Sequence, residues 1–330
     1  MGEVATVRIL LVGCGQLGSR HLQAVAGLPQ VTTIEVVDPR PEALALGRER
    51  LGEVAGRSPS TEFRWLTSLQ DATPDGDLCI VATQAQGRCQ LVQEIVRRLG
   101  YRRFLLEKIV GQSIGEFDEL LAFSKASNLS VWVNLKTRAY QIHQRIKQQL
   151  DPHDPIMVSI TGGNHGLANN GVHGADLFAF YDEASQILST GSQIDTMLHR
   201  TKRGLFDLSG SLEGATEKGS RFLLSYADGP ADWELMTIAT HRSRWIVDHF
   251  QRWVMESHAA SGWAWEPVPF TEHILVSDMT TRFAAEILAV GRCDLPTLEQ
   301  AGVAHRYILG ALRPHFSRLM EREVELCPVT

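Results

Sequence analysis

The stretch ILLVGCGQLGSRH, residues 9–21, decides how the first part of the chain folds. Gly13, Gly15 and Gly18 follow the spacing G-x-G-x-x-G, which by itself can also mark an ordinary turn between a strand and a helix. The run VRILLVG, which leads into the glycines, is typical of a buried parallel strand. After them, SRHLQAVAGLP has helical apolar spacing and stops at Gly-Leu-Pro.

A second predicted strand, TTIEVVD, completes the pattern of a dinucleotide-binding unit. It ends at Asp38, which is 38 − 18 = 20 positions after Gly18. In such a unit the first glycine permits the turn, the second lets the backbone approach a pyrophosphate, and the third lets helix and strand pack closely. The helix N-terminus supplies N–H groups and the positive end of its dipole to the phosphates. The predicted phosphate loop therefore includes Gln16 and Leu17.

The residues after the second strand bear on the choice of dinucleotide. Asp38 can accept hydrogen bonds from the ribose hydroxyls and would repel a 2′-phosphate, which favours NAD. Arg40 lies two residues further on and could pair with such a phosphate, so NADP stays an alternative.

Three further runs, DLCIVAT, RRFLLEK and LSVWVNL, predict strands that alternate with amphipathic helices. This alternation predicts a doubly wound parallel sheet, which holds its ligands at the carboxyl ends of its strands. Thr83 and Lys108 stand at two such ends. After about residue 150 the runs become short and alternating, which predicts a largely antiparallel, open sheet. Residues 169–182 and 295–316 predict helices.

Length and composition narrow the class of protein. The 330 residues suggest two domains, and a net charge of −6 without a basic run argues against nucleic-acid binding. No apolar run approaches the roughly 18 residues of a membrane span, and the start does not look like a secretory signal. The five cysteines form no CxxC pair, so we expect reduced thiols, a cytoplasmic protein and no structural zinc.

The chain resembles the Gfo/Idh/MocA oxidoreductases over nearly its whole length. The resemblance rests on VGCGQLGSRH, VVDPRPEALAL, IVATQAQGRCQLV, LLEKI, VNLKTRAY, GVHGADLFAF and LPTLEQAGVAHRYI. It implies a Rossmann domain over 1–136 and a substrate-binding and oligomerisation α/β domain over 137–330, with the last helix packing back toward the first domain. It also implies a homodimer or homotetramer built through the second sheet. GQLGSRHLQ and GGNHGLANNGVHGADLFAF are similar to members associated with bacterial surface polysaccharides and nonulosonic acids.

The resemblance also assigns catalytic roles. The family motif E-K-P corresponds to Glu107, Lys108 and Ile109, and Lys108 is implied as the lysine that hydrogen-bonds the reacting oxygen. Ile109 lacks the ring with which proline fixes the backbone. The family often has Asp four residues before a catalytic histidine, whereas this chain has Asn169 before His173; an asparagine can orient a hydroxyl but cannot take its proton.

The family stretch A-T-P-N-x-x-H corresponds here to ATQAQGR, in which Gln84 and Arg88 are the departures. We expect them to alter a contact near the nicotinamide.

Hydride transfer from an alcohol needs a donor to the oxygen and a group that accepts the hydroxyl proton. Lys108 suits the first task, and His173, with an ordinary pKa near 6.5, suits the second. Asp176 lies one turn after His173 and could hold its tautomer or a substrate hydroxyl. Three alternatives stay open: His173 is purely structural, Lys108 is merely solvated, or His173, Asp176 and His165 bind a metal.

Several polar residues of the second half suggest contacts to substrate. Arg138 and Lys136 could hold an anionic group, and Asn164, His165 and Asn170 lie in a polar, glycine-rich loop that could bind sugar hydroxyls. Lys202 is a weaker candidate of the same kind. The predicted cofactor-binding residues are Gly13, Gly15, Gln16, Leu17, Gly18, Asp38, Arg40, Thr83, Gln84, Arg88, Glu107 and Lys108. The predicted catalytic residues are Lys108, His173, Asn169 and Asp176; the predicted substrate-binding residues are Arg138, Asn164, His165, Asn170 and Lys202; no metal ligand is predicted.

These patterns favour an NAD(P)-dependent oxidoreductase that interconverts a secondary alcohol and a ketone on a sugar-like, nucleotide-linked or acidic small molecule. Two alternatives remain. Asn169 and Arg88 suit a C=N reductase in amino-sugar chemistry. The departures at Asn169 and Ile109 suit a sensor or accessory protein that binds NAD without turnover. In each case the partner is a small molecule, with no nucleic acid and no membrane.

Overall fold

The computed structural model describes residues 6–54, 60–164, 166–201, 204–229, 233–272 and 274–330. The chain forms two compact units. The first unit comprises Met1–Gly111, Gly115–Asn134 and His273–Leu298, and the second comprises Gln112–Ile114, Leu135–Glu272 and Glu299–Thr330. The predicted α/β fold class, a Rossmann-like parallel sheet and a second, largely antiparallel sheet, is confirmed.

The first unit is built on a six-stranded sheet in the order β3-β2-β1-β4-β5-β6, in which every pairing is parallel. Its strands are β1 (Val7–Val12), β2 (Val31–Val37), β3 (Glu62–Leu66), β4 (Leu78–Val81), β5 (Arg103–Leu106) and β6 (Ser130–Val133). The central strand β4 is buried along its whole length, as expected for a parallel strand covered on both faces. The order reverses between β1 and β4, and ligands of such sheets bind at that point.

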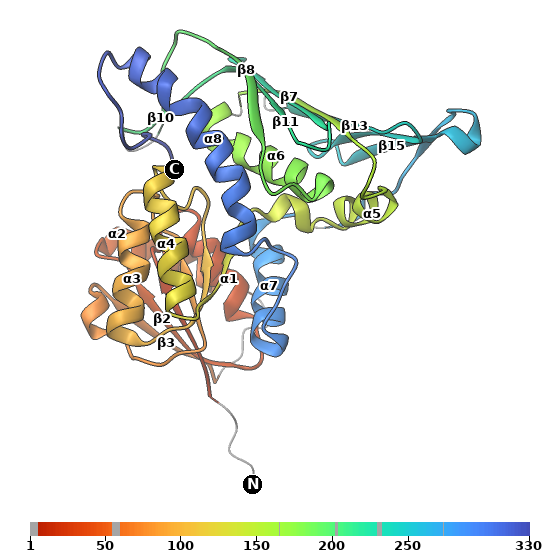
Figure 1. The fold of residues 1–330 in the computed structure, drawn as a ribbon. Coiled ribbons are helices and arrows are strands. Elements are labelled where there is room, and N and C mark those ends of the chain that lie inside the picture. The colour runs from red at the N-terminus through yellow and green to blue at the C-terminus, as the bar shows by residue number, and fades with distance from the viewer. Residues whose placement is uncertain (1–5, 55–59, 165, 202–203, 230–232, 273) are drawn as a thin grey trace. The chain divides into compact units, whose positions relative to one another are not determined.

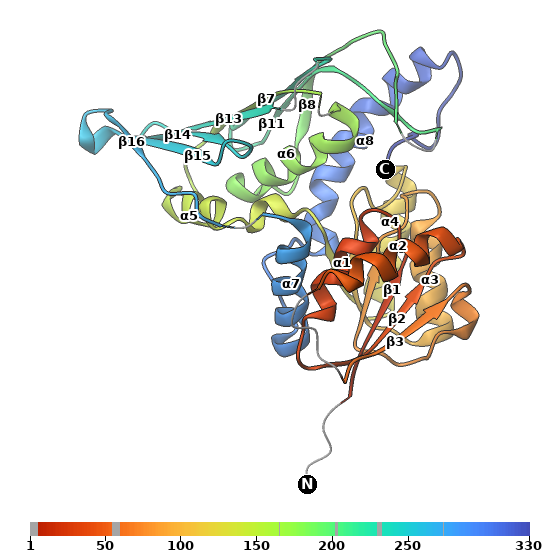
Figure 2. The same ribbon diagram turned by 180° about the vertical axis from the view of Figure 1, so that it is seen from behind.

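The described residues of this unit form five helices. They are α1 (Gly18–Ala26), α2 (Pro41–Gly52), α3 (Arg88–Leu99), α4 (Ile114–Ala126) and α7 (Val276–Val290), with a short 3₁₀ turn η1 (Leu69–Asp71). Helices α3 and α4 lie in front of the sheet in Figure 1, and α1 and α2 lie in front of it in the reverse view of Figure 2. Helix α7 comes from far along the chain but packs beside α1 (Figure 2). Its residues fall within 137–330, the range that the family resemblance assigns to the second domain.

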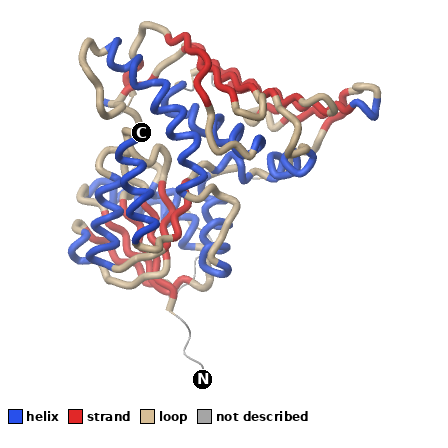
Figure 3. The backbone as a smooth tube through the Cα atoms, viewed as in Figure 1, coloured by secondary structure: helices blue, strands red, loops and turns tan. Residues whose placement is uncertain are grey.

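The second unit contains an eight-stranded sheet in the order β16-β15-β14-β13-β7-β12-β11-β8. Figure 3 draws the strands in red. Its strands are β7 (Met157–Gly163), β8 (Leu188–Ile194), β11 (Gly210–Ala215), β12 (Arg221–Ala227), β13 (Trp233–Ala239), β14 (Ser243–Asp248), β15 (Trp253–His258) and β16 (Trp265–Pro267). Among the described pairings of this sheet, β7 with β12 is parallel and the others are antiparallel. A separate two-stranded ribbon joins β9 (His199–Arg200) to β10 (Phe206–Asp207).

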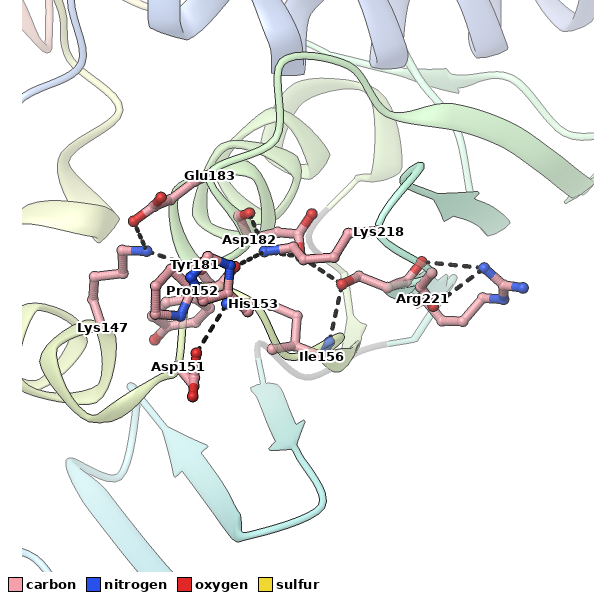
Figure 4. Close-up of polar contacts among 12 residues, drawn as sticks. Lys147, Asp151, Pro152, His153, Ile156, Tyr181, Asp182, Glu183, Lys218 and Arg221 are labelled. Atoms are coloured by element: carbon pink, nitrogen blue, oxygen red, sulfur yellow. Dashed lines mark hydrogen bonds and ion pairs between the residues drawn. The ribbon is translucent and has the colours of Figure 1, made fainter.

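The helices of this unit are α5 (Gln141–Gln149), α6 (Leu167–Asp182) and α8 (Leu298–Leu319), with 3₁₀ turns η2 (Lys136–Ala139) and η4 (Ala259–Ser261). Two lysines hold the C-terminal end of α6 (Figure 4). Lys147 Nζ donates to the Tyr181 carbonyl at 3.1 Å, and Lys218 Nζ donates to the Asp182 carbonyl at 2.6 Å. Cations at this end satisfy the last carbonyls and complement the helix dipole. Side chains from outside α6 thus fix the C-terminal end of the helix that carries His173.

Within the described part of the chain, no helix combines the length and the apolar character that crossing a membrane requires.

Candidate functional site

The glycine loop between β1 and α1 needs glycine for steric reasons. Gly13 has a φ of +90°, and a Cβ on it would lie 2.9 Å from the Ala82 carbonyl carbon. A Cβ on Gly18 would lie 1.9 Å from the carbonyl oxygen of Gly13. In the described helix α1, the first turn contains no acidic residue and no side chain caps it. The loop is therefore as tight as a phosphate-binding turn requires, and the helix behind it favours an anion.

Asp38, at the end of β2, already accepts several hydrogen bonds from the protein. One oxygen accepts from the Cys14 N–H at 2.8 Å and from Arg40 Nη2 at 3.0 Å, and the other accepts from the backbone N–H and Nε of Arg40. Burial opposes ionisation, but these hydrogen bonds outweigh it and lower the pKa of Asp38. The Asp38 side chain is 2% exposed, whereas that of Arg40 is 42% exposed. Arg40 is therefore the charged group that solvent or a ligand reaches at this position.

Arg50, on α2, also holds the glycine loop. The sequence analysis did not predict this contact. Its guanidinium donates to the backbone carbonyl and the side-chain oxygen of Gln16, and to Ser19 Oγ at 2.7 Å. These contacts fix the loop residue Gln16, whose side chain is exposed. No local sequence pattern joins residues 16 and 50, which explains why the contact was not predicted.

The ends of β4 and β5 bring Thr83, Gln84 and Lys108 to the carboxyl edge of the sheet, and all three side chains are partly exposed. Arg88, by contrast, is buried, which corrects the expectation that it contacts the cofactor. It is 1% exposed, and its guanidinium donates to the backbone carbonyls of Thr83, Glu107 and Ile109. The peptide bond between Lys108 and Ile109 is cis, although residue 109 is not proline.

Glu107 was also predicted to bind cofactor, but its carboxylate faces the core of the first unit. It accepts from His21 Nε2 at 2.8 Å and from Asn134 Nδ2, and His21 Nδ1 lies 2.9 Å from Thr280 Oγ1 of α7. Burial opposes ionisation, but the hydrogen bond and charge of His21, the hydrogen bond of Asn134 and the charge of Lys108 lower the pKa of Glu107 to about 2. These contacts therefore anchor Glu107, the residue before Lys108.

Helix α6 carries three of the predicted catalytic residues, but Asp176 is committed elsewhere. Its carboxylate receives two hydrogen bonds from the Arg138 guanidinium, at 2.7 and 2.6 Å, and both side chains are buried. Burial raises the pKa of Asp176, and Arg138 opposes that shift. The two residues therefore neutralise each other. This corrects two expectations: that Asp176 orients His173 or a substrate, and that Arg138 holds an anionic substrate. His173 itself is partly exposed.

Asn169 is held by a carboxylate that the sequence analysis did not consider. Its Nδ2 donates to Asp207 Oδ2 at 2.6 Å, and its Oδ1 accepts from the Thr330 N–H at 3.0 Å. Asp207 also accepts from the Ala168 N–H in the first turn of α6, at 2.9 Å. Burial raises the pKa of Asp207, and these hydrogen bonds oppose the shift. Asp207 therefore fixes both the start of α6 and the side chain of Asn169.

Comparison by sequence found nothing: no protein-family model matches the chain, and no curated protein is significantly similar to it. Comparison of structures found many matches. UDP-N-acetylglucosamine 3-dehydrogenase GnnA from Acidithiobacillus ferrooxidans is 16% identical with a TM-score of 0.71, over 97% of this chain and 98% of GnnA. A Gfo/Idh/MocA family oxidoreductase from Vibrio cholerae is 14% identical with a TM-score of 0.70, over 96% of this chain and 100% of that one. The chain has the Gfo/Idh/MocA fold.

Another structure with this fold was solved with a nucleotide and a cofactor. KijD10, a 3-ketoreductase from Actinomadura kijaniata in complex with TDP-benzene and NADP, is 16% identical with a TM-score of 0.70, over 94% of this chain and 97% of that chain. Other matching structures were solved with NAD or NAD⁺.

Asn164, Asn170 and Lys136 are the described residues that remain among those predicted to contact the substrate. Asn164 is exposed at the end of β7, and Asn170 is partly exposed in the first turn of α6. Lys136 donates from Nζ to the Tyr140 hydroxyl at 2.8 Å. His165 and Lys202 lie outside the described residues. No group of three or more His, Cys, Asp or Glu side chains in the described ranges is arranged to hold a metal ion.

Proposed function

We propose that the chain is an oxidoreductase that uses NAD or NADP to interconvert a secondary alcohol and a ketone on a sugar-like substrate, with nucleotide-linked sugars as the first class to test. The first unit would bind the dinucleotide. Residues of the second unit would bind the sugar and exchange its proton.

The observation that carries this proposal is the glycine loop. A Cβ on Gly18 would clash with the Gly13 carbonyl oxygen, so only glycine allows α1 to start this close behind β1, as the third glycine of a dinucleotide-binding turn does. It stands at the point where the strand order of the sheet reverses, and structural neighbours with this fold hold NAD or NADP.

We assign the chemistry to Lys108 and His173. Lys108 follows β5 at the carboxyl edge of the first sheet, where it would donate a hydrogen bond to the reacting oxygen. His173 lies on α6, whose ends are fixed by Asp207 and by two lysines, and it would take the proton of the substrate hydroxyl. Asn169, held by Asp207, would present its amide to the substrate. Asn164 and Asn170 are the further residues that we propose for binding hydroxyl groups.

The test is a turnover assay that follows absorbance near 340 nm with a panel of nucleotide sugars and either dinucleotide. We expect at least one sugar to be turned over. Lys108→Ala and His173→Ala should each reduce kcat by about 10²–10⁴-fold, the usual contribution of a general acid or base. His153→Ala is the matched control, because His153 is exposed on a loop of the same unit as His173. Unchanged turnover in both active-site variants would rule out the assignment.

We further propose that the second sheet joins two copies of the chain. Its strand registers place Met157, Trp233, Trp253 and Trp265 on one face, where they are 64%, 45%, 44% and 43% exposed. The opposite face carries buried residues such as Trp245 and Phe222. Several large exposed apolar side chains on one face are typical of an interface. Light scattering should show a dimer or tetramer that Trp233→Glu with Trp253→Glu dissociates; a monomeric wild type would contradict the proposal.

A further inference from the structure

We propose that Arg88 is a positioning residue for Lys108 and that it does for the backbone what a proline at position 109 would otherwise do. The inference rests on the proposed function, because Lys108 matters only if a dinucleotide binds beside it. It adds a role for a residue whose side chain is buried.

The hydrogen bonds of Arg88 enclose Lys108. Nη1 donates to the carbonyl of Glu107, at 2.5 Å, and to the carbonyl of Ile109, which are the residues on either side of Lys108. Nη2 donates to the carbonyl of Thr83, just beyond the end of the neighbouring strand β4. One planar guanidinium therefore joins two strand ends and both neighbours of Lys108. A lysine or histidine at position 88 could not span three carbonyls in this way, because neither has a planar fork of five donors.

The burial of Arg88 is costly, which indicates that its hydrogen bonds matter. The side chain is 1% exposed, and within the described residues its Nε has no hydrogen-bond partner. Burial lowers the pKa of Arg88 to about 10, and the Glu107 carboxylate partly offsets the shift, so the group is charged at neutral pH. An apolar residue would fill this part of the core at lower cost. What an apolar residue could not do is hold three carbonyls.

Ile109 has no ring to fix its φ, so the backbone after Lys108 must be held by contacts. Glu107 is fixed through its side chain by His21 and Asn134. The Ile109 carbonyl is fixed by Arg88. The two departures from the family pattern, Arg88 and Ile109, thus meet in one hydrogen-bonded unit, and we infer that the first compensates for the second.

Hydrogen–deuterium exchange of the ligand-free protein tests whether Arg88 holds this segment. Arg88→Met should accelerate exchange of residues 104–112 by about tenfold or more, the effect expected from losing charged hydrogen bonds. Arg88→Met with Ile109→Pro should recover part of that protection. Arg98→Met, on the exposed face of the same helix, is the control and should leave the segment unchanged. If Arg88→Met does not fold, Arg88→Lys replaces it and should give an intermediate acceleration.

A second measurement connects the segment to the dinucleotide. Lys108 is labelled with pyridoxal 5′-phosphate and borohydride and quantified by mass spectrometry, with NADH or NADPH as the probe. In the wild type the bound dinucleotide should slow labelling about tenfold. In Arg88→Met the affinity for the dinucleotide should change less than about threefold, while most of the shielding of Lys108 is lost.

The outcomes separate the two proposals. A wild type that binds neither dinucleotide defeats the proposed function. If the wild type binds a dinucleotide but Arg88→Met matches it in exchange rate and in the shielding of Lys108, only the proposed role of Arg88 is overturned. The same holds if exchange accelerates equally throughout the first unit, or if Ile109→Pro restores nothing, because Arg88 would then be an ordinary core residue.

Discussion

Arg138 and Asp176 form a buried two-point ion pair, with Nε to Oδ2 at 2.7 Å and Nη2 to Oδ1 at 2.6 Å. The pair joins the 3₁₀ turn η2 to the middle of α6, close to His173 in the chain. Each residue by itself looked like a contact to substrate. Together they neutralise each other's charge and fix α6. The charged groups that were predicted to contact the substrate therefore stabilise the second unit instead.

Arg138→Met should therefore destabilise the protein rather than weaken substrate binding alone. It leaves the Asp176 carboxylate buried without its cation, which typically costs about 3–5 kcal/mol. Arg98→Met removes a surface pair with Glu94 and should cost no more than about 1 kcal/mol. Urea unfolding of both variants measures the difference. Equal losses of unfolding free energy would show that the Arg138–Asp176 pair is not a buried anchor.

Gly18→Ala should disrupt the glycine loop. The added Cβ would lie 1.9 Å from the Gly13 carbonyl oxygen, and Gly13 is itself fixed by a hydrogen bond from its N–H to the Val37 carbonyl. We expect a lower melting temperature and at least about a tenfold weaker affinity for the dinucleotide. Gly52→Ala is the control, since no atom lies within 4 Å of its Cβ. A Gly18→Ala protein that binds like the wild type would show that the loop is not the phosphate site.

The acid stability of the protein should depend on Glu107. Its pKa is lowered to about 2 in the folded protein, so its contribution is complete above an unfolded pKa near 4.5 and is lost as the pH falls from there toward 2. The contribution is on the order of 3 kcal/mol. In Glu107→Gln, unfolding free energies measured from pH 7 to pH 3 should fall less steeply than in the wild type, whereas Glu94→Gln, at an exposed site, should follow the wild type. Parallel curves for Glu107→Gln and the wild type would disprove this role.

Arg40 should control the choice between the two dinucleotides. Its guanidinium pairs with Asp38 and is the accessible charge at the end of β2. Arg40→Ala removes a cation and exposes the Asp38 carboxylate, so the affinity for NADPH relative to NADH should fall by about tenfold or more. Arg48→Ala is the matched control, because the Arg48 guanidinium stacks over the Trp65 ring, 4.6 Å from its centroid. Fluorescence titration with both reduced cofactors gives the ratio. An unchanged ratio in Arg40→Ala would show that Arg40 does not face the ribose.

Local patterns in the sequence were enough to predict the first strands, the glycine loop and the position of Lys108. Each depends on residues close together in the chain, such as the glycines after β1 and the acid after β2. The alternating runs of the second half also predicted most of its strands. Strand β3 was missed because its residues are only partly buried at the edge of the sheet, so no strong apolar run marks it.

The partners of the polar side chains could not be predicted, because they come from distant parts of the chain. Arg138 and Asp176 are 38 residues apart, and His21 and Thr280 are 259 apart. The sequence shows that Arg88 is a charged residue near a strand end but not that its hydrogen bonds end on three backbone carbonyls. Asp207 follows no motif, and only the fold reveals that it holds Asn169.

The most direct test of the account is calorimetric titration of the intact protein with NADH, NADPH and their oxidised forms. The glycine loop predicts saturable binding of at least one of them, with one site per chain, and a loss of that binding in Gly18→Ala that is much larger than any change in Gly52→Ala. A folded wild type that takes up none of the four dinucleotides would contradict the central claim.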